Sequence, residues 1–159
     1  MSSARPSQFP TVATLAQKTV CLLAGTPVLT MDGVLPVEYL VVGDRIMTRA
    51  GARKLTSFVV RVDRDIDMVR IGAGTLGFDR PCAETLLPLH QLILIRDWRA
   101  QALYGAPQAL VAAGRLADGA HISIESVTEA RLFMLGFADD VVIYAGGLEL
   151  ACMRETVSA

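Results

Sequence analysis

Two kinds of side chain in this sequence could carry covalent chemistry: the thiols of three cysteines and the imidazoles of two histidines. Cys21 stands where a short polar segment gives way to a long run of strand-like sequence, and His90 directly precedes the strand-like, largely apolar residues 91–95, Gln-Leu-Ile-Leu-Ile. A polar side chain at the start of such a run is costly unless it has a partner. A thiol nucleophile and an imidazole proton donor form a catalytic pair when a fold brings them together. Cys21 and His90 are therefore the candidate catalytic residues.

Both residues also have a structural interpretation. A buried cysteine packs as a small apolar side chain, and a histidine before a strand can hydrogen bond to the backbone. The second histidine, His121, follows the turn-forming pair Asp118-Gly119 and is expected at the surface. The residues alone leave the catalytic and the structural interpretation open.

The sequence predicts no metal site and no cofactor. Cys21, Cys82 and Cys152 are an odd number of cysteines at wide spacings, which provides neither a disulfide framework nor a CxxC metal motif. Residues 72–77, Gly-Ala-Gly-Thr-Leu-Gly, share their glycine spacing with dinucleotide-binding loops, but no helical pattern follows them. We therefore expect no cofactor-binding residues.

The composition predicts one folded domain. With 159 residues, 52% of them hydrophobic, and a mean hydropathy of +0.44, the chain is long enough for one buried core. Its 15 basic and 16 acidic residues give a net charge of -1, which offers no basic field for nucleic acid. No apolar run reaches the roughly 18 residues of a membrane-spanning helix, and the N-terminal segment lacks the apolar core of a classical secretion signal. We expect neither a nucleic-acid nor a membrane partner, and a location in the cytoplasm or outside the cell by a non-classical route.

Short runs rich in Val, Ile, Leu and Thr recur between Gly, Pro and Asp from about residue 19 onward, which predicts an all-β fold. Residues 1–19 contain prolines and few large apolar side chains, so they are predicted to form an extended leader, and residues 20–159 the single β domain. The expected strands are residues 27–30, 34–37, 45–48, 55–63, 68–71, 91–96, 120–126, 130–136 and 141–145.

Turns and two helical segments interrupt these strands. Asp32-Gly33 and Asp139-Asp140 fall between strand-like runs and are expected in hairpin turns, and the alternating charges of residues 61–67 indicate a solvated hairpin. Residues 37–42 favour a single helical turn. Residues 106–116, rich in Ala and Leu, favour a helix.

Two motifs place Cys21 and His90 among characteristic neighbours. Residues 21–33 are Cys-Leu-Leu-Ala-Gly-Thr-Pro-Val-Leu-Thr-Met-Asp-Gly, and residues 36–48 are Pro-Val-Glu-Tyr-Leu-Val-Val-Gly-Asp-Arg-Ile-Met-Thr. This order resembles the opening of a Hint domain, the module shared by Hedgehog C-terminal domains and inteins, and above all its bacterial branch. Residues 86–94, Leu-Leu-Pro-Leu-His-Gln-Leu-Ile-Leu, are similar to the second Hint motif. The resemblance covers about residues 21–144 and implies an all-β Hint-like horseshoe of short strands with pseudo-two-fold halves.

The resemblance also implies a chemistry. The Cys21 thiol would attack the Val20 carbonyl and convert the Val20–Cys21 peptide bond into a thioester by an N-to-S acyl shift. His90 would protonate the departing amide nitrogen, and general acid help of this kind is worth about 10² to 10⁴ in rate. Water or a small nucleophile would then open the thioester and release residues 1–20, so the chain's own N-terminal segment would be the substrate.

Three departures from the family pattern bear on this activity. Leu87 occupies the position where the family has Thr or Ser, and leucine donates no hydrogen bond. The chain contains no Asn, which excludes the side-chain cyclisation that completes intein splicing. Asp139-Asp140 stands near the last hairpin, where the bacterial branch often has a His-Glu pair. The alternatives are therefore a degenerate Hint domain that acts as a binding or structural module and, in third place, a cysteine hydrolase acting on other molecules.

One acidic residue of the first motif, Asp44, has a structural interpretation too. Asp44 follows Gly43 and is expected to fix a turn through a backbone hydrogen bond rather than to stabilise an imidazolium.

Overall fold

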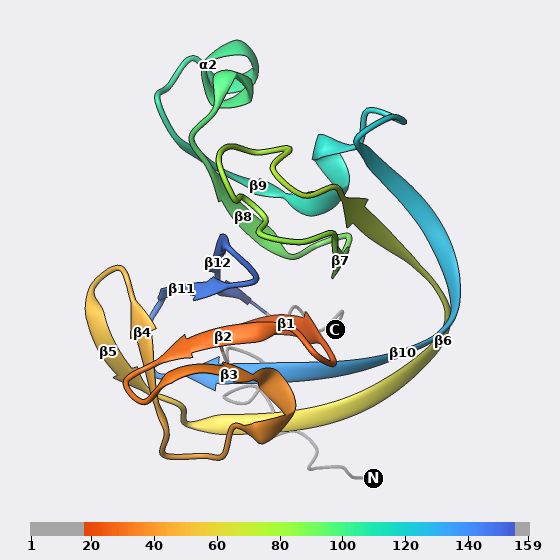
Figure 1. The fold of residues 1–159 in the computed structure, drawn as a ribbon. Coiled ribbons are helices and arrows are strands. Elements are labelled where there is room, and N and C mark those ends of the chain that lie inside the picture. The colour runs from red at the N-terminus through yellow and green to blue at the C-terminus, as the bar shows by residue number, and fades with distance from the viewer. Residues whose placement is uncertain (1–17, 155–159) are drawn as a thin grey trace, which may run out of the picture.

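The computed structural model describes residues 18–154, which form two β-sheets, and the all-β prediction is confirmed (Figure 1). The predicted leader lies outside the described residues except for Lys18 and Thr19, which are the first residues of β1. The strands of the smaller sheet are β1 (Lys18–Leu23), β6 (Ser57–Ile71), β7 (Thr85–Pro88), β10 (Ile122–Phe137) and β13 (Met153–Arg154). They are ordered β13-β1-β10-β6-β7.

The larger sheet contains the β2–β3 hairpin that Asp32-Gly33 predicts, with the turn at residues 31–32. Its strands are β2 (Pro27–Thr30), β3 (Gly33–Pro36), β4 (Arg45–Thr48), β5 (Gly51–Lys54), β8 (Leu92–Ile95), β9 (Ala109–Ala112), β11 (Val142–Ala145) and β12 (Leu148–Ala151). They are ordered β3-β2-β4-β11-β12-β8-β9, with β5 beside β4. Predicted strand 45–48 matches β4, and predicted strand 141–145 matches β11 within one residue.

A long antiparallel ribbon of β6 and β10 curves along one side of the molecule (Figure 1). The solvated hairpin predicted at residues 61–67 is wrong, because β6 continues through this segment without a turn. Charged residues here pair along and across the ribbon, as Arg64 does with Glu129 at 3.1 Å. Because both faces of this part of β6 are largely exposed, its charge pattern resembles that of a turn.

The helical predictions have mixed outcomes. The single turn expected at residues 37–42 is present as the 3-10 helix η2, which covers only Val37–Tyr39. The helix predicted at 106–116 is wrong: this segment contains β9 and the 3-10 turn η3 (Ala113–Leu116). Pairing of β9 along all four residues of β8 overrides the helix propensity of its alanines. Helix α2 (Trp98–Tyr104) is capped at its N-terminus by Asp97, whose side chain accepts a hydrogen bond from Arg99 N.

Successive residues of β1 face two different apolar clusters. Val20 and Leu22 lie in the main core, whereas Cys21 lies in a smaller cluster on the opposite face of the strand. Strand β7 packs directly against β1, which brings the segment before His90 next to Cys21. The fold therefore joins the first and second sequence motifs.

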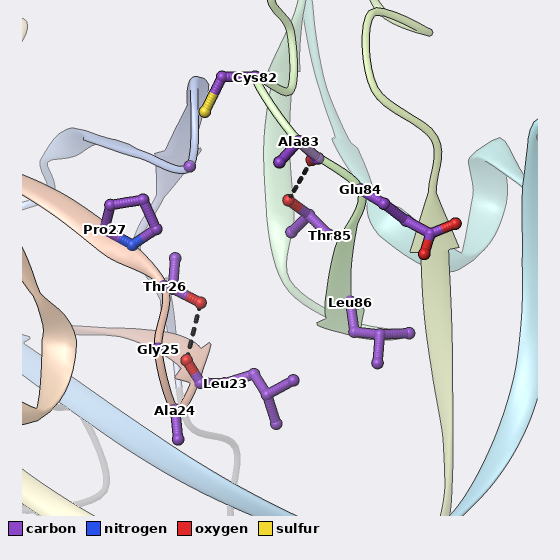
Figure 2. Close-up of a pocket in the computed structure, with 11 residues that line it drawn as sticks. Leu23, Ala24, Gly25, Thr26, Pro27, Cys82, Ala83, Glu84, Thr85 and Leu86 are labelled. Atoms are coloured by element: carbon purple, nitrogen blue, oxygen red, sulfur yellow. Dashed lines mark hydrogen bonds between the residues drawn. The ribbon is translucent and has the colours of Figure 1, made fainter.

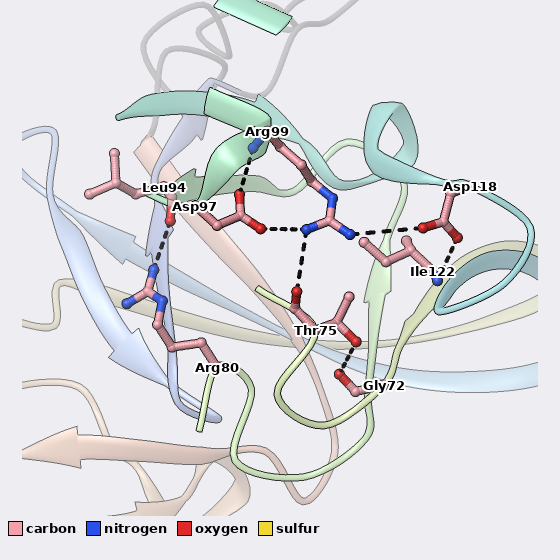
Figure 3. Close-up of polar contacts among 8 residues, drawn as sticks. All are labelled: Gly72, Thr75, Arg80, Leu94, Asp97, Arg99, Asp118 and Ile122. Carbon is pink, nitrogen blue, oxygen red and sulfur yellow. Dashed lines mark hydrogen bonds and ion pairs between the residues drawn. The ribbon is translucent and has the colours of Figure 1, made fainter. Parts of the chain in front are cut away.

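Two arginines fix the long segment between β6 and β7. Arg99 Nη1 donates to Thr75 O at 3.3 Å and also pairs with Asp97, while Arg80 Nη2 donates to Leu94 O at 3.0 Å (Figure 3). These contacts attach the segment to α2 and to β8, so it leads into β7 along a defined path. Within the described range, no helix is long and apolar enough to cross a membrane.

Candidate functional site

Cys21 occupies the fourth position of the six-residue strand β1, and it lies opposite Met134 of β10. Ala24 N donates to Arg131 O at 3.0 Å, which makes these two residues a hydrogen-bonded pair. In an antiparallel ladder such pairs alternate, so Cys21 belongs to a pair without ladder bonds. Its N–H therefore points away from β10, and the carbonyl of Val20 points toward β10.

The Cys21 N–H donates a buried hydrogen bond of 2.8 Å to Gln91 Oε1. Gln91 is fully buried, and its Nε2 donates to Leu92 O at 3.0 Å and to Ala151 O at 2.8 Å. One amide side chain thus connects β1, β8 and β12. The candidate scissile peptide unit is held by β10 on its carbonyl side and by Gln91 on its nitrogen side.

The resemblance to Hint domains implies that His90 acts on the Cys21 nitrogen, and the structure places its neighbour Gln91 there. His90 is exposed in the two-residue turn after β7. Leu87 is fully buried and belongs to the main core, whereas Leu86 packs against the Cys21 cluster. The structure therefore directs the Leu87 side chain away from the cluster that surrounds Cys21.

The side chain of Cys21 is buried, with 2% of its surface exposed. It packs in an apolar cluster with Met68 of β6 and with Ala130, Leu132 and Met134 of β10. These neighbours supply dispersion contacts and exclude water from this face of β1.

The polar residues of the first motif hydrogen bond to backbone groups. Glu38 Oε1 accepts from Gly25 N at 2.8 Å, and Val37 N donates to Thr26 O at 2.9 Å, so η2 is attached to the loop after β1. Hydrogen bonds from its own N–H and from Gly25 N–H lower the pKa of Glu38. The turn role predicted for Asp44 is confirmed, since its Oδ2 accepts from Val41 N at 2.9 Å.

A cleft of about 270 Å³ lies between residues 23–27 and residues 82–86 (Figure 2). The hydroxyl groups of Thr26 and Thr85 each donate to a carbonyl two or three residues earlier, at 2.7 and 2.9 Å. The exposed residue Cys82 also lines the cleft. The predicted catalytic pair is not among the lining residues, whereas an enzyme acting on other molecules would need such a cleft at its nucleophile.

The remaining candidates lie on other segments of the described chain. His121 is exposed, as expected. Burial raises the pKa of the Cys152 thiol to about 11. Asp140 lies in the connection between β10 and β11, and its carboxylate is 3.9 Å from the Lys18 ammonium at the start of β1. The hairpin turn predicted at Asp139-Asp140 is wrong, because β10 and β11 belong to different sheets. Among the described residues, no three His, Cys, Asp or Glu side chains are grouped so as to hold a metal ion.

Comparison with known sequences and structures defines the class of protein. A sequence profile described as the Hint domain matches residues 20–156, and the chain belongs to this family. Among curated proteins, no sequence is similar enough to count as a relative.

The fold resembles those of several solved intein structures. A bacterial intein-like domain from Clostridium thermocellum matches with a TM-score of 0.58 at 14% identity, over 83% of this chain and 97% of that one. The gp41-1 intein matches with a TM-score of 0.53 at 15% identity, over 82% and 97% of the two chains. The MchDnaB-1 intein gives 0.53 at 12% identity, over 82% and 98%. At such low identities these matches establish the Hint fold alone.

Gln91 is the site residue that the sequence analysis misses. A polar residue before an apolar strand needs a buried partner, and this signal fits both His90 and Gln91. Strand β8 begins at Leu92, so it is Gln91 whose side chain enters the interior.

Proposed function

We propose that this chain is a Hint domain that keeps its Val20–Cys21 bond intact and serves as a binding or structural β module. The observation that carries this proposal is the hydrogen bond from Cys21 N to Gln91 Oε1. In an N-to-S acyl shift the thiol sulfur bonds to the Val20 carbonyl carbon, the C–N bond breaks, and the nitrogen takes up a proton as it leaves. An amide oxygen accepts hydrogen bonds but supplies no proton.

The ladder around the bond also supports the proposal. Lys18 and Thr19 pair with both β10 and β13, and Val20 is fully buried in the main core. Release of residues 1–20 would remove half of β1 from these partners. Burying a valine side chain is worth about 1.5 to 3 kcal/mol, so the intact strand stabilises the uncleaved chain.

Self-cleavage at Val20–Cys21 is the second candidate, and one specific observation favours it. The residue that contacts the Cys21 nitrogen directly follows His90 in the sequence. A shift of this segment by one residue would exchange the Gln91 amide for the His90 imidazole, which is a general acid. In this alternative Cys21 is the nucleophile, and water or a small nucleophile accepts the acyl group.

Intact mass separates the two candidates. The purified full-length chain is incubated at neutral pH with and without dithiothreitol or hydroxylamine, which open thioesters. We expect the full mass to persist. Loss of the mass of residues 1–20, absent in Cys21→Ala and slowed in His90→Ala, would instead establish self-cleavage. Loss that persists in Cys21→Ala would identify proteolysis by a contaminant.

A gain-of-function variant tests the physical reason. Gln91→His places an imidazole next to the Cys21 nitrogen, where the wild type has the Gln91 amide oxygen. If the bond persists because this amide supplies no proton, the variant should release residues 1–20 where the wild type does not. An equally stable variant with unchanged circular dichroism would show that the ladder around β1, rather than Gln91, protects the bond.

A further inference from the structure

A buried carboxylate on the larger sheet is surrounded by three guanidinium groups. Glu149 of β12 has a side chain only 4% exposed. Its Oε1 lies 2.9 Å from Arg80 Nη1, and its Oε2 lies 2.7 Å from Arg96 Nη2 and 3.4 Å from Arg49 Nε. One guanidinium would neutralise the carboxylate, so the other two positive charges are left without a counter-charge in the cluster.

These arginines also carry more hydrogen-bond donors than the cluster has acceptors. Each guanidinium has five N–H groups in a rigid, planar arrangement. Arg80 Nη2 donates to Leu94 O (Figure 3). Its Nη1 donates to Glu149, and its buried Nε has no acceptor in the described structure. The side chains of Arg49 and Arg96 are 38% and 43% exposed, so their remaining donors are accessible from solvent.

An apolar cavity on the same face of the sheet is lined by the cross-strand neighbour of the buried carboxylate. Tyr144 of β11 lies directly opposite Glu149 in the ladder, so the two side chains share a face. Tyr144 lines a cavity of about 200 Å³ together with Leu29 and Val34. Arg49 N donates to Val142 O at 3.0 Å, which places Arg49 beside the strand that carries Tyr144.

We propose that this face binds a small organic anion, with its carboxylate on Arg49 and Arg96 and its apolar body in the cavity beside Tyr144. A guanidinium binds a planar carboxylate through two parallel N–H bonds, and such charge-assisted bonds are stronger than neutral ones. The apolar lining distinguishes this site from a simple phosphate site. The proposal is independent of cleavage at Val20–Cys21.

Three small molecules, each titrated into the full-length chain, test the anion-binding part and the apolar part of the site. Hexanoate carries both the anion and an apolar body, 1-hexanol lacks the charge, and inorganic phosphate lacks the apolar body. Isothermal titration calorimetry should show saturable binding of hexanoate, and weaker binding of both partial probes. Arg96→Gln should weaken hexanoate binding about tenfold, which is the scale of one charge-assisted contact. Val34→Asp, at the exposed edge of the cavity, should weaken it as well.

A matched control removes an arginine elsewhere. Arg64 pairs with Glu129 on the β6–β10 ribbon and is 73% exposed, so Arg64→Gln should leave hexanoate binding unchanged. Thermal unfolding confirms that each variant is folded. If Arg96→Gln is not folded, Arg49→Gln decides, because Glu149 then keeps Arg80 and Arg96.

Several outcomes would overturn the proposal. These are absence of saturable hexanoate binding, equal affinity in the arginine variants and the wild type, or equal affinity for 1-hexanol and hexanoate. Phosphate binding as tightly as hexanoate would equally contradict it, because the cavity would then contribute nothing.

Discussion

The two Hint motifs of this chain differ in what their polar residues do. In the first motif, Glu38 and Asp44 bind backbone N–H groups of nearby loops. In the second motif, Leu87 lies in the main core, His90 faces solvent and Gln91 binds the nitrogen of Cys21. The first motif thus shapes the fold, and the second contacts the candidate peptide bond with an amide instead of an acid.

This difference separates the residues that shape the fold from the residue that contacts the candidate peptide bond. The hydrogen bond from Gly25 to Glu38 is needed to attach η2 to the loop after β1, whatever happens at Cys21. The fold therefore continues to require the first motif when no reaction occurs. A buried polar group in the second motif must also be satisfied, and Gln91 meets that requirement without supplying a proton.

The largest expected effect comes from Gln91→Ala. This change leaves the buried Cys21 N–H and the Ala151 carbonyl without their partner and creates a cavity. Each buried unsatisfied group costs about 1 to 3 kcal/mol, so we expect a loss of about 4 kcal/mol in the free energy of unfolding. Urea denaturation followed by circular dichroism measures it.

The adjacent residue supplies the control. His90 is exposed, so His90→Ala should change the free energy of unfolding by no more than about 0.5 kcal/mol. Similar losses in the two variants would mean that the buried amide does not hold the two motifs together. Comparable stability of Gln91→Ala and the wild type would contradict the role given to its hydrogen bonds.

Much of the fold is predictable from sequence, because alternating apolar residues and Gly or Asp punctuation mark β4, β11 and the β2–β3 hairpin. The helix predicted at 106–116 failed, since pairing with β8 decides the conformation of β9 and such long-range pairing leaves no local signal. The division of β6 into two predicted strands failed for a related reason: its middle is solvated on both faces yet paired to β10.

The site was harder to predict than the fold. Motif order located Cys21 and the turn containing His90, and the structure brings the residue after that turn to the Cys21 nitrogen. The start of β8 decides which side chain after β7 points inward. A shift of this start by one residue would replace Gln91 with His90 as the inward-pointing residue. Strand boundaries are set by tertiary pairing, so the sequence pattern did not resolve this difference.

The backbone near the two motifs differs in how closely it is packed. Gly147, at φ +81°, lies against the segment that leads into the second motif, and a Cβ there would be 2.6 Å from both Asp79 O and Cys82 N. Gly25 of the first motif has φ +89° and open space around it. Positive φ costs an L-residue roughly 1 to 2 kcal/mol, and a backbone clash adds about 1 to 3 kcal/mol.

We therefore expect Gly147→Ala to lower the free energy of unfolding by about 3 kcal/mol and Gly25→Ala by about 1 kcal/mol. Chemical denaturation of the two variants under the same conditions gives the difference. Equal losses would show that positive φ alone, and not the close approach of residues 79–82, determines the cost at Gly147.

The smallest expected effect concerns Glu38 and depends on pH. Its hydrogen bonds to backbone N–H groups lower its pKa below the ordinary value of 4.5. A carboxylate with a lowered pKa in the folded state adds stability above the unfolded-state value, and this stability is lost as the pH falls through the folded-state pKa. Glu38→Gln should therefore be less stable than the wild type at about pH 7, and the difference should shrink below pH 4.5.

Urea denaturation of wild type and Glu38→Gln across this pH range measures the effect. Glu129→Gln, on the distant β6–β10 ribbon, accounts for the general effect of removing one negative charge. A difference between wild type and Glu38→Gln that stays constant from neutral to acidic pH would mean that the charge of Glu38 is irrelevant and that its oxygen acts only as a neutral acceptor for Gly25. The first motif would then stabilise the loop by geometry alone, as Gln91 does in the second motif.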